Sequence, residues 1–115
     1  AKTGEYEEAL GYFEKAVKTN ILMLSPDIVR WMNVCYLADA HTRRGTIFYE
    51  NIQKNHPGYY YLNLYQAVLY KAHFDYDSAR RELTQLLKRY DIDRATKETA
   101  QKLLREIDEE GGKKS

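Results

Sequence analysis

The chain carries three histidines, the residue type that most often serves in catalysis or metal binding. His41, His56 and His73 are far apart in the sequence, and none has a second histidine or a cysteine at the spacing of a metal site. His73 and Asp75 flank Phe74, and we interpret this segment as a turn with a solvated histidine, not as an acid–base pair. No Ser–His–Asp or Cys–His arrangement and no glycine-rich phosphate loop is present. The sequence therefore predicts a protein that is not an enzyme and has neither a metal nor a cofactor.

The other reactive side chains lead to the same expectation. Cys35 is the single cysteine, so an intrachain disulfide is impossible. It lies between Val34 and Tyr36 in an apolar stretch, which favours a buried, inert thiol. Asp75 and Asp77 lack the further oxygen ligands and the glycine of a calcium loop.

The charges are nearly balanced, with 18 basic and 17 acidic residues and a net charge of +1. This balance gives no electrostatic reason to expect strong binding to nucleic acid or to an anionic membrane. If the basic pairs converged they would form an RNA-binding stripe, although the acidic residues among them favour a mixed surface. These pairs are Arg43-Arg44, Arg80-Arg81 and Lys88-Arg89.

The chain has no apolar run approaching the roughly 18–20 residues that a membrane span requires. Its first residues do not form a signal peptide. We therefore expect a cytoplasmic protein, an expectation that a targeting segment preceding this sequence would change.

Apolar side chains recur at spacings of three and four, which is typical of amphipathic helices. Ser25 and Pro26 form a strong helix start, Pro57 stops a helix, and Asp93 is suited to cap the last one. No strand alternation is present, so the sequence predicts an all-α fold. We expect helices at about 5–19, 26–39, 42–55, 59–72, 77–89 and 94–109.

Three further features concern the packing of these helices and the C-terminal end of the chain. Gly11 and Gly45 lie inside helices and predict close helix–helix approaches. The connection at 20–26 is apolar, and we expect Ile21, Leu22, Met23 and Leu24 to pack down because they would otherwise form a sticky patch. Residues 111–115 are expected to be a disordered tail.

A pattern of small and large residues returns along the chain at a nearly fixed spacing. Ala9, Gly45 and Ala79 each precede a large residue by four positions, and Gly45 lies 36 residues after Ala9 and 34 before Ala79. A period near 34 is typical of stacked helix–turn–helix units. The large residues are Phe13, Tyr49 and Leu83, followed three positions later by Ala16, Ile52 and Leu86.

With these residues the chain resembles the tetratricopeptide repeat (TPR) family. In that family the first helix of each unit carries a small residue and, three later, a large aromatic; Ala67 and Tyr70 match, and Asn33 and Tyr36 match less well. The resemblance implies an all-α, right-handed superhelix of stacked antiparallel helix hairpins, a TPR-like α-solenoid with a C-terminal capping helix. It also implies a single domain over 1–110, made of a half repeat at 1–20, repeats at 26–57 and 59–92, and a capping helix at 94–110.

The resemblance further implies a function: TPR-like proteins hold peptides or partner helices in the groove lined by the first helix of each unit. The chain would then be a non-catalytic protein–protein interaction module or scaffold, with Arg30 and Lys71 steering acidic groups of the partner. The carboxylate clamp of the chaperone-binding subset is not matched. The groove residues would be Arg30, Trp31, Val34, Tyr61, Leu64, Tyr65, Val68 and Lys71, with Asp27 and Leu37 beside them.

Several alternatives stay open at this point. Trp31 and the tyrosines, of which the chain has 11, could be core residues that fill the space between helices. The incomplete first repeat could be completed by a partner chain or by self-association, as in a co-chaperone or assembly factor. An RNA-binding helical repeat is the least favoured of these readings.

Overall fold

The computed structural model describes residues 3–38 and 40–112. The described residues form six α-helices and one short 3-10 helix and contain no strand, which confirms the all-α prediction. None of these helices is long and apolar enough to cross a membrane. The elements are α1 (Thr3–Thr19), η1 (Ile21–Met23), α2 (Pro26–Ala38), α3 (Thr42–Asn55), α4 (Tyr61–Ala72), α5 (Tyr76–Leu87) and α6 (Arg94–Gly112).

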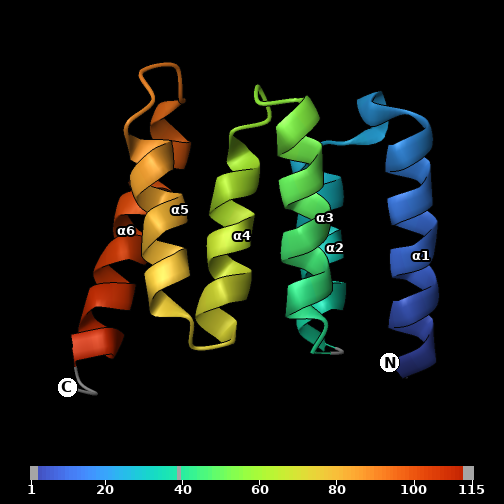
Figure 1. The fold of residues 1–115 in the computed structure, drawn as a ribbon, viewed down its shortest axis with the longest axis horizontal. Coiled ribbons are helices and arrows are strands. Elements are labelled where there is room, and N and C mark those ends of the chain that lie inside the picture. Colours follow the sequence, from blue (N-terminus) through green and yellow to red (C-terminus); the bar gives the residue numbers. More distant parts are fainter. Residues whose placement is uncertain (1–2, 39, 113–115) are drawn as a thin grey trace.

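The helices lie side by side in a compact array with α1 at one end and the pair α5 and α6 at the other (Figure 1). The array measures 38 × 33 × 21 Å. Each helix packs against its successor in the chain, and α4 also contacts both α2 and α6. The helices α2, α4 and α6 therefore form a connected set, with α3 and α5 packed beside them.

Local capping explains where three of the helices begin. The side chains of Ser25, Asp75 and Asp93 each accept a hydrogen bond from the backbone N–H three residues later, at 3.3, 3.1 and 3.0 Å. These bonds satisfy backbone donors that the first helical turn leaves unpaired. The starts expected at Pro26 and after Asp93 are thereby confirmed.

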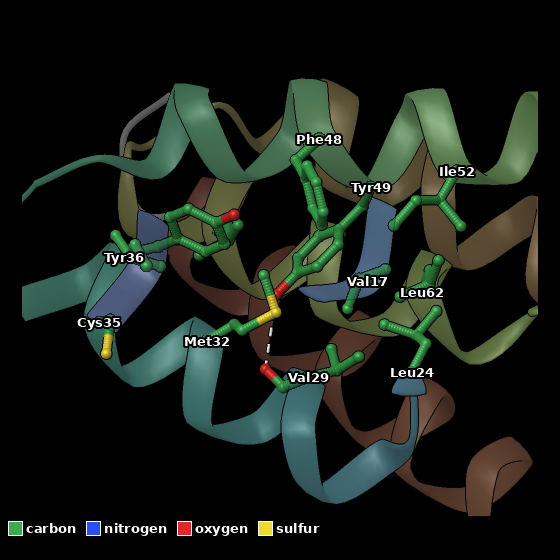
Figure 2. Close-up of a cluster of buried hydrophobic side chains, with 12 residues drawn as sticks. Val17, Leu24, Val29, Met32, Cys35, Tyr36, Phe48, Tyr49, Ile52 and Leu62 are labelled. Carbon is green, nitrogen blue, oxygen red and sulfur yellow. Dashed lines mark hydrogen bonds between the residues drawn. The ribbon is translucent and has the colours of Figure 1, made fainter. Parts of the chain in front are cut away.

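Two clusters of buried side chains hold the array together. Figure 2 shows part of the first, where residues of α2 and α3 face one another and the Tyr49 hydroxyl lies 3.4 Å from the Val29 carbonyl oxygen. We call it the α1–α4 core; it contains Leu10, Val17, Leu24, Val29, Met32, Cys35, Tyr36, Phe48, Tyr49, Ile52, Leu62 and Leu69. The second, the α4–α6 core, contains Ala67, Ala79, Leu83, Leu86, Ala100 and Ile107.

Gly45 and Gly11, both inside helices, have opposite surroundings. A Cβ atom on Gly45 would lie 2.5 Å from Leu69 Cδ1 and 2.7 Å from Tyr36 Cδ2, so the close approach predicted there is confirmed. A Cβ atom on Gly11 would meet nothing within 4 Å. The close approach predicted at Gly11 is therefore wrong within this chain, because Gly11 lies on the exposed side of α1.

The connection after α1 packs down only in part. Leu24 is buried and Ile21 packs against the α1–α4 core, but Leu22 is 81% exposed and Met23 is also exposed. The prediction that the whole segment packs down is therefore wrong, because the 3-10 turn directs only some of its side chains inward.

The boundaries differ from the predicted ones by two or three residues at four helix ends. The first helix begins at Thr3 where 5 was expected, and α5 ends at Leu87 where 89 was expected. The helix expected from 59 begins at Tyr61, because Tyr59 and Tyr60 form tighter turns that accept from the N–H groups three residues on, at 3.2 and 3.1 Å. At the C-terminus α6 continues through Gly111 and Gly112, where a disordered tail was expected. The rest of that tail, 113–115, lies outside the described residues, as does residue 39 at the expected end of the second helix.

Candidate partner-binding groove

One side of α2 presents apolar side chains to solvent. Trp31, Val34 and Leu37 are 55%, 46% and 40% exposed and recur every three residues. Together with Asp27 and Arg30, two of them line a shallow depression of about 250 Å³. Trp31 is therefore not a core residue, which excludes that alternative and leaves its indole accessible.

The orientation of α2 is fixed by its opposite side. Val29, Met32 and Tyr36 are fully buried in the α1–α4 core. Asn33, also buried, donates from its side-chain amide to the Tyr65 carbonyl oxygen at 3.2 Å, so it joins α2 to α4. The Tyr49 hydroxyl donates to the Asn33 side-chain oxygen at 2.7 Å, which adds α3 to the same network. Rotation of α2 about its axis would break these buried contacts, so Trp31 is held outward.

The expected groove residues of α4 lie deeper than those of α2. Tyr61 and Tyr65 pack against the α1–α4 core and meet edge to face, with ring centroids 6.5 Å apart. Leu64 packs against the α4–α6 core, and Val68 is half-buried. Tyr61 and Tyr65 therefore fill space between helices, and part of each side chain stays accessible.

Tyr61 carries an additional polar feature. Its hydroxyl oxygen is buried and has no hydrogen-bond partner among the described residues. Burial raises the pKa of this phenol to about 12, so it stays protonated at physiological pH. Its ring meets those of Tyr59 and Tyr65 edge to face, with centroids 6.0 and 6.5 Å away.

The two cations predicted to steer an acidic partner differ in accessibility. Arg30 forms an ion pair with Asp27 at 2.9 Å, but both side chains remain largely exposed. Lys71 is partly buried beneath α6, where its ammonium lies 3.3 Å from Glu110 Oε1 and 3.7 Å from Glu106 Oε1. The steering role expected of Lys71 is not supported by this geometry, because two carboxylates of α6 already match its charge.

The basic pairs are distributed among carboxylates. Arg44 pairs with Glu14 at 3.0 Å, and comparable ion pairs join Arg80 to Asp108 at 3.0 Å and Arg89 to Asp91 at 2.8 Å. One member of each pair is thus neutralised locally. These contacts favour the mixed surface expected from the sequence over a basic stripe for RNA.

Glu14 also fastens α1 to the rest of the array. Its carboxylate accepts from the buried Tyr36 hydroxyl at 2.7 Å and from two guanidinium nitrogens of Arg44 at 3.0 Å each. Burial, followed by the hydrogen bond to Glu14, raises the pKa of Tyr36 far above its usual range. This contact joins α1 to α2 and α3 and holds α1 in place at its end of the array.

A cleft of about 460 Å³ between α1 and α3 has no counterpart in the sequence prediction. Val17, Phe48 and Ile52 contribute to its walls, and the Lys18 ammonium lies 5.9 Å from the centroid of the Phe48 ring. The cleft depends on residues about 30 positions apart in the sequence, so no local motif could have indicated it.

Asp75, which flanks His73 in sequence, uses its carboxylate to cap α5. Among residues 3–38 and 40–112, no group of three histidine, cysteine or acidic side chains is placed to hold a metal ion. No family model, curated protein or solved structure matches this chain.

Proposed function

We propose that this chain is a TPR-like helical repeat module that binds a segment of another protein, without catalysis, in a groove lined by α2 and α4. The proposal draws on the repeat pattern of the sequence and on the contacts of α4 with both α2 and α6. In a stack of helical hairpins, the first helices of successive units contact one another in this way.

The observation that carries the proposal is the exposed side of α2. A tryptophan, a valine and a leucine spaced three residues apart form a continuous apolar strip, defined here as the α2 strip (Trp31, Val34 and Leu37). Aromatic anchors surrounded by smaller apolar groups are characteristic of the residues that contribute most to protein–protein affinity.

The chemistry of the groove indicates the kind of ligand that fits. The α2 strip and the accessible edges of Tyr61 and Tyr65 would contact apolar side chains of the ligand. Arg30, exposed at the border of the α2 strip, would favour an acidic residue nearby. The expected ligand is therefore an amphipathic helix or extended peptide with a small apolar face and at least one carboxylate.

Trp31 makes this testable without a known partner, since it is the single tryptophan of the chain. Peptides selected from a displayed library should shift the emission of Trp31 on binding, because binding buries its indole. Val34→Asp and Leu37→Ser should each weaken that binding about tenfold while leaving helicity unchanged, because both residues are exposed.

Tyr90→Ser serves as the matched control, because Tyr90 is a fully exposed aromatic residue between α5 and α6. It should leave both the affinity and the emission shift unchanged. Peptides that bind equally well to the Val34→Asp variant, or a library that yields no peptide able to shift Trp31 emission, would exclude the groove.

A further inference from the structure

We propose that the outer side of α1 is a second interaction surface, through which two copies of this chain form an antiparallel dimer. One side of α1 packs into the α1–α4 core through Leu10 and Val17. The opposite side is exposed and carries Glu8, Gly11, Tyr12, Lys15 and Thr19, which we call the outer face of α1. This surface is separate from the groove and does not depend on the groove function.

The centre of the outer face has the shape that a second helix requires. Tyr12 is 70% exposed, although an aromatic side chain of this size is usually buried on folding. Gly11 beside it has open space where a side chain would be, which costs helix stability without any packing benefit inside the chain. A second helix can approach closely at Gly11, and the Tyr12 ring of one copy can then cover Gly11 of the other.

The charges of α1 select the orientation of the second copy. Glu5 and Glu8 lie in its first half, and Lys15 and Lys18 lie in its second half. A two-fold axis between Gly11 and Tyr12 places Glu8 level with Lys15 of the second copy, since the two residues are equally far from that point.

In a parallel pairing, Glu8 of one copy would instead lie beside Glu8 of the other, and Lys15 beside Lys15. Both contacts join like charges and are repulsive. Glu8 and Lys15 are both exposed, and neither takes part in a salt bridge between side chains of the described residues. The antiparallel arrangement therefore gives both groups a partner of opposite charge, and the two-fold symmetry doubles each contact.

The experiment is a charge swap read out by analytical ultracentrifugation over a concentration series. The unmodified chain should show a reversible monomer–dimer equilibrium that weakens with added salt. Glu8→Lys alone and Lys15→Glu alone should each weaken the dimer about tenfold or more, because each turns two attractive pairs into two repulsive ones.

An equimolar mixture of the two single variants should restore association, since one copy then presents two lysines and the other two glutamates. The double variant carrying both substitutions should also recover the dimer. Lys102→Glu, an exposed charge reversal on α6, is the control and should leave the equilibrium unchanged.

Three results would overturn the proposal: a chain that stays monomeric at every concentration, a dimer that the single variants do not weaken, or variants that do not associate when mixed. Each can be distinguished from failure of the groove proposal, because the Trp31 emission assay uses a different surface and runs at concentrations where the chain is monomeric.

Discussion

Substitution of alanine for Gly45 and for Gly11 should change stability in opposite directions. Gly45 and Gly11 both lie inside helices, so alanine improves the helical propensity of both. Only at Gly45 does a new methyl group meet other atoms. It would come within 2.5 Å of Leu69 Cδ1 and within 2.9 Å of two ring atoms of Tyr36, and both of these side chains are fully buried.

The magnitudes follow from these surroundings. Replacing glycine by alanine in a helix interior stabilises by about 0.5–1 kcal/mol, and nothing opposes this gain at Gly11. Overpacking a dense core costs about 1–3 kcal/mol, which exceeds the same gain at Gly45. We therefore expect Gly11→Ala to raise the free energy of unfolding by up to about 1 kcal/mol and Gly45→Ala to lower it by about 1–2 kcal/mol.

Urea unfolding followed by circular dichroism measures both changes. The protein concentration is kept low, because self-association would add to the apparent stability. The slope of the transition should be the same for both variants, so that the midpoints report stability directly. If Gly45→Ala were as stabilising as Gly11→Ala, the packing of α3 against Tyr36 and Leu69 described above would be wrong.

Two further predictions concern pH. Burial raises the pKa of Glu82 above its usual range, against the hydrogen bond that Asn63 donates to it at 2.7 Å. Its charged form therefore destabilises the fold as pH rises above the ordinary glutamate value of 4.5, and Glu82→Gln should raise the free energy of unfolding at pH 7. Denaturant unfolding at several pH values checks this, and equal stability at pH 7 would contradict it. At Asp93, hydrogen bonds from Thr96 and then Tyr60 lower the pKa to about 2. The stability contributed by this carboxylate is complete above its ordinary pKa of 3.8 and is lost as pH falls through about 2, so Asp93→Asn should remove that part of the acid loss in helicity. An unchanged acid transition would show that the cap contributes nothing to it.

The helix boundaries that carry a local signal were predictable because that signal lies in residues adjacent in sequence. Ser25 followed by Pro26 marks a start by the local chemistry of a cap, and the same holds for Asp93. Pro57 interrupts a helix for an equally local reason, since it has no backbone N–H to donate. No knowledge of the neighbouring helices was needed for any of these.

The surroundings of individual side chains were not predictable in the same way. Gly11 and Gly45 look alike in sequence, and only the packing of α2, α3 and α4 makes one crowded and leaves the other open. The position of Lys71 in the repeat pattern predicts a groove residue. In the structure, however, α6 brings Glu106 and Glu110 close to its ammonium. These contacts join different helices, and periodicity along one helix carries no information about them.

Large apolar side chains are exposed at both ends of the array, and only some of them belong to the two proposed surfaces. Phe74 and Tyr90 are exposed near α5, whereas Ala100 and Ile107 of α6 are fully buried. Near the other end Tyr12, Leu22 and Trp31 are all exposed. The two proposed surfaces lie toward this end, on α1 and on α2. They are nevertheless on different helices, so dimerisation through Tyr12 should leave the emission of Trp31 unchanged, and the groove should bind its ligand equally in monomer and dimer.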